Sequence, residues 1–213
     1  MKRLIICGVI ALALFVITGC GERADTAIVP MPPAANKAEV DVINSAEGIT
    51  GDVVPGVIYR PCTPGRVPQP LRIAPYNLSD FYQQYCDARG IPVIGSSRVD
   101  PAALTAAHQR VFHMSRNPDH RQSMIANNLR VAIMAQDEVT TDIPEHSDLN
   151  TAFPDTDWNV YRGLGATIAR PAVSGAEENL LGLPGDIYAG EDILVHEFAH
   201  GIHELGITPI DGS

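Results

Sequence analysis

Residues 191–205 read EDILVHEFAHGIHEL and contain the pattern H-E-x-x-H at His196, Glu197 and His200. On an α-helix, residues four apart lie about 40° apart around the axis and about 6 Å apart along it, so both imidazoles can reach one metal ion. Glu197 follows about 100° round from His196, where a carboxylate can take a proton from water without being a ligand itself. The stretch therefore predicts a Zn²⁺ site with His196 and His200 as ligands and Glu197 as general base.

The residues around the motif favour a helix with one buried face. Glu191 and Asp192 place negative charge in the first turn, which stabilises a helix start. Apolar residues then gather on one side of the helical wheel, with the two histidines on the other. These apolar residues are Leu194, Val195, Phe198, Ile202 and Leu205. The alternative is an amphipathic helix with solvated histidines, because a three-position motif also occurs by chance.

The N-terminus has the features of an export signal. Lys2 and Arg3 precede an apolar run over residues 4–18. The run is shorter than the roughly 20 residues of a spanning helix and ends in small residues. Residues 1–19 are therefore predicted to be a signal peptide, with an uncleaved anchor as the alternative. Residues 17–20, ITGC, resemble the lipobox of bacterial lipoproteins, which implies that Cys20 becomes a lipid-carrying N-terminus. We expect an extracytoplasmic protein that this lipid anchors to a bacterial membrane, at the cell surface or the periplasmic face.

Length and composition predict one folded domain behind a tether. The chain has 213 residues, of which 45% are apolar, enough for a proper core. Residues 20–52 are rich in alanine and proline and are predicted to be a flexible tether, with the domain over residues 53–213. The net charge of −10 gives a surface that repels nucleic acid, so we expect no DNA or RNA partner.

The cysteines are consistent with an oxidising compartment. The sequence has four cysteines. Cys7 lies in the predicted signal and Cys20 at the lipidation site, which leaves Cys62 and Cys86 for the domain. An even pair outside the cytoplasm is most simply a disulfide, with two free buried thiols as the alternative.

Local patterns predict a mixture of helices and strands. Helices are expected over about 77–88, 101–114 and 119–127, from caps, an Asp-Pro start and apolar spacing. Residues 129–135, LRVAIMA, are predicted to be a strand buried on both faces, and residues 91–94 a shorter strand. Residues 53–59, interrupted by proline and glycine, are at most an edge strand. Residues 136–190 have few periodic segments and are predicted to be a long loop, which is either functional or contains elements that the patterns miss.

The motif and its uncharged variable positions resemble the extended pattern of zincin metallopeptidases. Three phrases, RGLGAT at 162–167, EENLL at 177–181 and PGD at 184–186, resemble more closely a group of functionally uncharacterised secreted zinc peptidases from bacteria and fungi. The likeness runs from about Phe81 to the end of the chain. It implies an α+β, zincin-like domain with a small sheet packed on the H-E-x-x-H helix. In zincins a peptide substrate lies extended along the lower edge strand of that sheet, and residues 129–135 would belong to the sheet.

Further charged and aromatic residues are candidates for the site. They are Arg162 and Arg170 as partners of carboxylates, Tyr161 and Tyr188 as oxyanion donors, and Glu145, His146, Glu177 and Glu178 as neighbours of the metal. Long charged side chains are mostly exposed, so we expect most of these residues to be solvated. His108 and His113 are expected at the surface or near the ligands.

The third ligand of the zinc does not follow from the motif. A catalytic zinc usually has three protein ligands and a water, and this helix supplies two. Metzincins have a histidine six residues after the second ligand, where this chain has Gly206, so that subclass is excluded. The remaining candidates nearby or in the loop are His203, Glu204, Asp211 and His146. Gluzincins, and the group that this chain resembles, carry a glutamate on a later helix, and no such segment follows His200. We therefore expect a zincin-like domain that stops short of its C-terminal helices.

These observations favour a membrane-tethered extracytoplasmic zinc metallopeptidase that hydrolyses peptides or proteins. The alternative is a non-catalytic or degenerate zincin-like surface lipoprotein that acts as a binding module. Zinc-dependent hydrolysis of a non-peptide amide would use the same residues.

Overall fold

The computed structural model describes residues 53–54 and 57–211. The predicted signal peptide, Cys20 and the tether lie outside the described residues. At the start of the described part, β1 (Val53–Val54) and β2 (Val57–Ile58) form a short antiparallel pair. The segment that was predicted to be an edge strand at most is therefore two very short strands.

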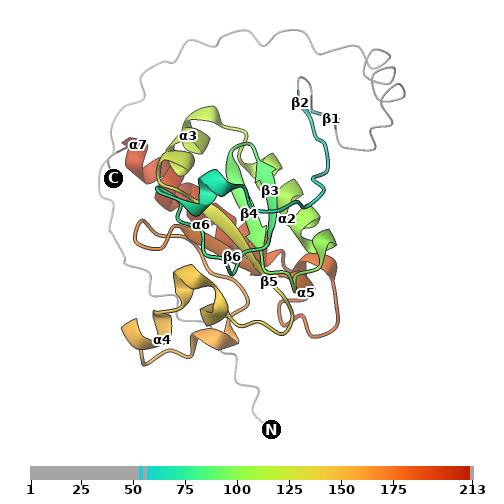
Figure 1. Cartoon of the computed structure of the whole chain (residues 1–213), viewed down its shortest axis with the longest axis vertical. Helices are drawn as coiled ribbons and strands as arrows, with labels where there is room; N and C mark the ends of the chain where they lie inside the picture. The colour runs from blue at the N-terminus through green and yellow to red at the C-terminus, as the bar shows by residue number, and fades with distance from the viewer. Residues whose placement is uncertain (1–52, 55–56, 212–213) are drawn as a thin grey trace, which may run out of the picture. The chain divides into compact units, whose positions relative to one another are not determined.

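A four-stranded mixed sheet lies at the centre of the domain (Figure 1). Its strands, in sheet order, are β3 (Gln84–Ala88), β4 (Ile91–Gly95), β5 (Arg130–Met134) and β6 (Ala172–Ala176). β3 and β4 are antiparallel, whereas β4, β5 and β6 run parallel to one another. The α+β class and the two predicted strands are confirmed. β5 is an inner strand that is buried at every position, as its apolar sequence predicts.

β3 replaces a helix that the sequence was predicted to form, so that prediction is wrong. Arg89 and Gly90 both have positive φ, 59° and 91°, which is the geometry of a tight two-residue hairpin turn. The backbone N–H of Gly90 also donates to Asp87 Oδ1 at 2.9 Å. Gly90 thus closes the β3–β4 hairpin and does not end a helix. Cys86 and Ala88 face the core while Asp87 between them is exposed, an alternation typical of a strand.

The two helices that follow β4 confirm the prediction. They are α2 (Pro101–Met114) and α3 (Pro118–Ala126). Asp100 caps α2 by accepting from the backbone of Ala102, and Asn117 caps α3 in the same way. The shorter helices are α4 (Leu149–Ala152), α5 (Glu177–Leu181) and α7 (Thr208–Asp211), with 3₁₀ turns at Gln69–Arg72, Thr140–Asp142, Pro144–His146 and Trp158–Val160.

Both faces of the sheet are buried, one against helices and the other against irregular chain. Val93, Val131 and Val173 point to one face, in one apolar cluster with residues of α2, α3 and the motif helix. Ile94 and Ala132, one position further along, point to the other face. That face packs against irregular chain that includes Val67, Leu78, Tyr82 and Ile143. The helices thus cover one side of the sheet.

The region from 136 to 190, predicted to be one long loop, contains β6 and α5. β6 reads AVSGA, and its small residues carry little strand propensity. It is a strand because its backbone pairs with β5 in register, for example Val131 with Val173. β6 is the edge strand beside the motif helix, so this correction bears directly on the site.

The buried histidine of α2 is a second correction. His108 was expected at the surface or near the ligands, but it is only 4% exposed. Its Nε2 lies 3.0 Å from the Asp87 carbonyl oxygen, and its Nδ1 lies 3.4 Å from the Tyr59 hydroxyl. Burial lowers the pKa of His108. Its imidazole joins α2 to β3 through the contact with the Asp87 carbonyl.

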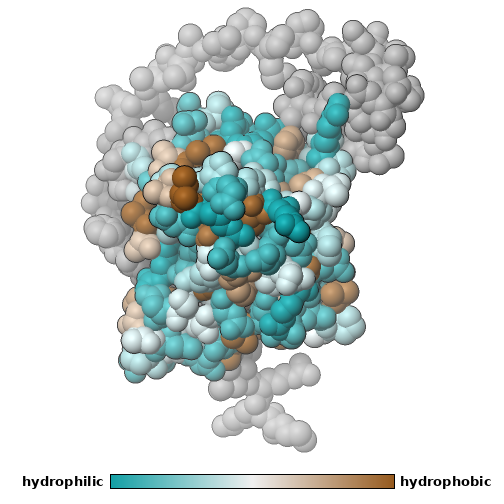
Figure 2. All heavy atoms as spheres, in the orientation of Figure 1, coloured by the Kyte–Doolittle hydropathy of each residue, from teal (hydrophilic) through white to brown (hydrophobic). Residues whose placement is uncertain are grey.

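Hydrophilic residues dominate the face shown in Figure 2, in keeping with the acidic composition. Within residues 53–54 and 57–211, no helix combines the length and apolar character needed to cross a membrane.

Candidate metal centre

The motif lies on α6 (Ile193–Gly201), which continues directly into a π-helix (Ile202–Ile207). The predicted helix is therefore confirmed, but it begins at Ile193, so Glu191 and Asp192 precede its first turn, and its last turn is wider. Asp192 caps its start: its Oδ1 accepts from the backbone of Val195 at 3.1 Å, and its Oδ2 accepts from Arg110 Nε at 2.5 Å. The Asn179 side chain also accepts from Ile193 N at 3.0 Å. These bonds fix where the helix begins, and so fix the position of the motif.

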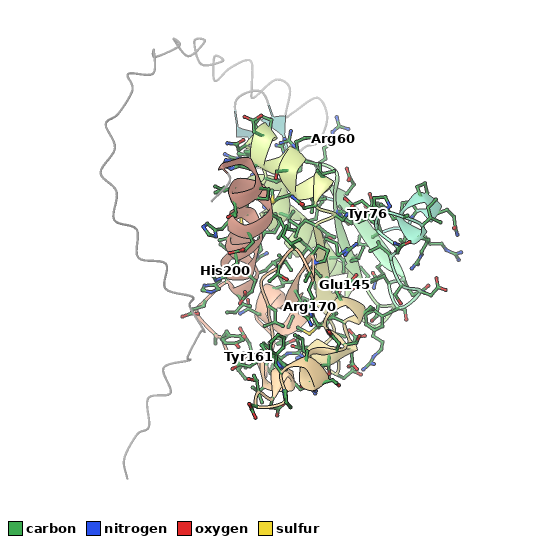
Figure 3. All side chains as sticks on the ribbon, turned by 90° about the vertical axis from the view of Figure 1, so that its left-hand side faces the viewer. Arg60, Tyr76, Glu145, Tyr161, Arg170 and His200 are labelled. Carbon is green, nitrogen blue, oxygen red and sulfur yellow. A yellow bond between two sulfur atoms is a disulfide. The ribbon has the colours of Figure 1, made fainter. Side chains whose placement is uncertain are left out.

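One face of α6 packs on the sheet and the other carries the motif. Leu194 and Phe198 are fully buried, as predicted. Val195 is 38% exposed, so its predicted place on the buried side is wrong. His196 and His200 are exposed and Glu197 is partly buried. His200 lies at the margin of the molecule in Figure 3.

The two imidazoles meet at the spacing that one zinc ion requires. His196 Nε2 and His200 Nε2 are 3.2 Å apart, and their ring centroids are 5.0 Å apart. Two nitrogens at a Zn–N length of 2.0–2.1 Å and a tetrahedral angle are about 3.3–3.4 Å apart. The ligand atoms of His196, Glu197 and His200 all lie within 4.8 Å of one another. The residues therefore fit a zinc ion, and Glu197 lies close enough to act on a water beside it.

The glycine segment, residues 163–165 before β6, packs against Glu197 and His200. Leu164 forms an antiparallel bridge to Ser174 of β6, with its N–H 3.3 Å from the Ser174 carbonyl and its carbonyl 2.9 Å from the Ser174 N–H. A Cβ on Gly165 would lie only 2.8 Å from His200 Cβ and 3.4 Å from Glu197 Oε2. A Cβ on Gly163 would collide with the side chain of Ile193. Glycine is therefore required at both positions by close approach, and the two glycines of the RGLG sequence are the signal of this packing.

The environment of Glu197 affects its protonation. Burial raises the pKa of Glu197, while His196 and a hydrogen bond from the Gly165 backbone lower it. Burial raises the pKa of Tyr188, with smaller contributions from Glu197 and Tyr161, and a hydrogen bond with the Arg162 backbone lowers it. Tyr161 is 38% exposed and its ring lies 5.9 Å from Trp158.

Arg162 holds the glycine segment in place. Its Nε donates to Glu178 Oε1 at 2.6 Å and its Nη2 to Glu178 Oε2 at 3.0 Å. The same guanidinium donates to the carbonyls of Ala135, at 3.0 Å, and Glu138. Glu177 accepts from two backbone N–H groups, those of Asp100 at 2.7 Å and Gln136 at 2.9 Å. Glu177 and Glu178 are buried, so the prediction that they are solvated is wrong, and both are occupied with partners away from the histidines.

The other proposed ligands are elsewhere. The His203 side chain is 67% exposed and pairs with Glu204 at 3.2 Å. Glu145 faces Arg130 and accepts from the Tyr82 hydroxyl. His146 is 1% exposed, and burial lowers its pKa to about 4. In the part of the chain that the structure describes, the metal-ligand cluster consists of His196, Glu197 and His200. If Glu197 is the base, the two histidines are the protein ligands that this described cluster offers, and a third one is absent from it. The side chain of Asp211 is outside the described part.

The remaining predicted site concerns the cysteines. In the structure a disulfide joins Cys62 to Cys86, across 24 positions of sequence. It ties the proline-containing segment before β3 to the sheet, since Cys86 lies in β3 and not in a helix.

Comparisons of the chain with protein-family models, curated proteins and solved structures found no match.

Proposed function

We propose that this protein is a zinc metallopeptidase. The observation that carries the proposal is the pair of Nε2 atoms 3.2 Å apart on an exposed helical face, with the Glu197 carboxylate beside them. His196 and His200 would hold Zn²⁺. When bound, such an ion polarises a carbonyl and lowers the pKa of water near it.

Proton transfer would then be carried out by the protein side chains. Glu197 takes a proton from the attacking water as general base and delivers it to the leaving amine as general acid. Its carboxylate is partly buried and accepts a hydrogen bond from the backbone of Gly165, which restrains its position. Tyr188, whose pKa the Glu197 carboxylate helps to raise, is the candidate donor to the oxygen of the tetrahedral intermediate.

An extended peptide is the substrate that suits this edge of the sheet. Leu164 directs its backbone N–H and C=O toward Ser174 of β6. The N–H of the next residue, Gly165, donates to the Glu197 carboxylate, so of its two backbone groups the C=O would pair with a peptide. Such a peptide would lie over Glu197 and His200, which Gly165 approaches closely. The zincin-like fold and the extracytoplasmic, lipid-anchored location through Cys20 belong to the same proposal. Mass spectrometry of native protein should then show a chain that begins at lipidated Cys20.

The proposal is tested by Glu197→Gln, which keeps the shape of the side chain but removes the base. General acid–base catalysis contributes about 10²–10⁴-fold, so turnover of a peptide library should fall by at least about a hundredfold while zinc stays bound. The control is His203→Ala, which alters an exposed histidine outside the cluster and should leave turnover unchanged. Equal turnover in the Glu197 variant and the wild type would refute the mechanism.

One observation favours a second candidate, a zincin-like binding module. The described cluster offers two histidines and one glutamate, whereas a catalytic zinc usually has three ligands in addition to the base. If Glu197 is a ligand, it cannot act as the base. Absence of hydrolysis by zinc-loaded wild-type protein across the peptide library would favour this second candidate.

A further inference from the structure

A polar cavity lies at the beginning of β5 and β6, and its lining contains none of the three motif residues. It has a volume of about 320 Å³, and its lining includes Tyr76, Ser79, Arg130, Glu145, Arg170 and Pro171. Arg130 is the first residue of β5, and Pro171 directly precedes β6. In Figure 3, the labelled Tyr76, Glu145 and Arg170 all lie to the right of His200.

Two polar groups of the lining have unmet hydrogen bonds. Arg130 is 4% exposed, and its Nη2 donates to the Tyr76 carbonyl at 2.8 Å, but its Nε has no hydrogen-bond partner. The Tyr76 hydroxyl is buried and likewise has none. The Arg130 guanidinium lies 5.4 Å from the centre of the Tyr76 ring. Leaving such donors buried and unpaired costs stability, so both are ready for an acceptor.

Glu145 does not meet this need. Its Oε1 is 3.7 Å from Arg130 Nε, which is too long for a hydrogen bond. Its Oε2 accepts instead from the hydroxyl of Tyr82, which is fully buried. The glutamate is thus held to the side of the unmet Nε–H.

The charge of the lining favours an anion. Two guanidinium groups, of Arg130 and Arg170, and one carboxylate, of Glu145, line the cavity, while Asp148 pairs with Arg170 from outside the lining. Arg130 is therefore the guanidinium with which an anion would pair. Arg170 is fixed at the rim by two bonds to Asp148, at 3.0 and 2.6 Å, so its charge is positioned without filling the cavity. Burial raises the pKa of Tyr76, which keeps its hydroxyl a donor at neutral pH.

We propose that this cavity binds an oxyanion, a carboxylate or phosphate group, through the Nε–H of Arg130 and the hydroxyl of Tyr76. Arg170 adds attraction at the rim. Arginine suits this role because its planar, permanently charged group binds such oxygens with defined geometry. The anion is either a free small molecule or the carboxylate of a peptide. This inference does not depend on zinc or on hydrolysis.

The test is an NMR titration that follows the Nε–H resonance of Arg130, assigned by its loss in Arg130→Lys. The probes are acetate, inorganic phosphate, and one peptide with a free or an amidated C-terminus. We expect a saturable shift with at least one oxyanion and none with chloride at the same ionic strength. Acetate or phosphate binding as tightly as the free peptide indicates a small anion. Tighter binding of the free peptide than of the amidated peptide or acetate indicates a peptide carboxylate.

Two variants make the result specific. Tyr76→Phe removes one donor and should weaken binding about tenfold or more, as expected for a hydrogen bond to a charged group. Its control is Tyr85→Phe, whose hydroxyl lies 3.4 Å from Asp87 and outside the cavity lining. Glu145→Gln removes the opposing carboxylate and should tighten binding. The proposal is overturned if no oxyanion shifts the resonance, or if Tyr76→Phe and Glu145→Gln both bind like the wild type.

Discussion

The buried pair of Arg162 and Glu178 should stabilise the fold far more than the exposed pair of Arg170 and Asp148. Both pairs are doubly hydrogen-bonded, with distances of 2.6 and 3.0 Å in each. They differ in burial. The side chains of Arg162 and Glu178 are 12% and 5% exposed, whereas those of Arg170 and Asp148 are 24% and 59% exposed. The exposed pair is thus a matched control for the effect of burial.

The expected magnitudes follow from the charge that each substitution leaves behind. Glu178→Leu leaves the Arg162 guanidinium buried with carbonyl partners only, and breaking a buried pair in this way costs about 3–5 kcal/mol. Asp148→Leu leaves the Arg170 guanidinium in contact with water, so the loss should be much smaller. Arg162 also anchors the segment over Glu197, so the larger loss should come with faster amide exchange at Gly165.

Urea unfolding of two double-mutant cycles would measure both pairs. Each cycle compares the wild type, the two single variants and the double variant, with methionine replacing arginine and leucine replacing the acid. We expect the coupling energy of the buried pair to exceed that of the exposed pair by about 2 kcal/mol. Equal coupling energies, or a buried pair below about 1 kcal/mol, would refute the reasoning that burial decides the strength of this contact.

Three further predictions concern the stability of the domain. Burial lowers the pKa of His146 to about 4, so between about pH 6.5 and 4 the unfolded chain binds a proton that the folded chain does not. The free energy of unfolding should therefore decrease as the pH is lowered through this range, by about 3 kcal/mol in all. His146→Gln should remove this part of the pH dependence in unfolding titrations. Replacing Cys62 and Cys86 together by alanine should cost about 3 kcal/mol in urea unfolding, because the bond closes a 24-residue separation, and reduction of the wild type should give a similar loss. Gly163→Ala should cost about 1–3 kcal/mol by overpacking against α6, whereas Gly65→Ala, with open space around it, should cost much less in thermal unfolding.

The motif helix could be predicted because its determinants are local. The spacing of His196 and His200 and the apolar side with Leu194 and Phe198 lie within a few residues, and so does the Asp100 start of α2. The apolar run of β5 likewise announces a buried strand. Such features depend on neighbours in sequence, and the structure has them where they were predicted.

The features that were missed depend on partners distant in sequence. β6 has small residues and becomes a strand only through pairing with β5. Glu178 looks like a solvated charge until Arg162, 16 positions earlier, is brought beside it. The segment of β3 was predicted to be a helix because its antiparallel pairing with β4, through the turn at Gly90, does not follow from the spacing of its own residues. The approach of Gly165 to His200 follows from the same long-range packing.

The most direct test of the central claim is zinc binding to the purified protein, by metal analysis and competition titration. His200→Ala removes one of the two histidines, and His203→Ala is the matched control on the same helical segment. We expect one zinc per chain in the wild type and in the His203→Ala variant, and loss of zinc binding in the His200→Ala variant. Zinc binding that is absent from the wild type, or unchanged in the His200 variant, would contradict the proposed metal centre.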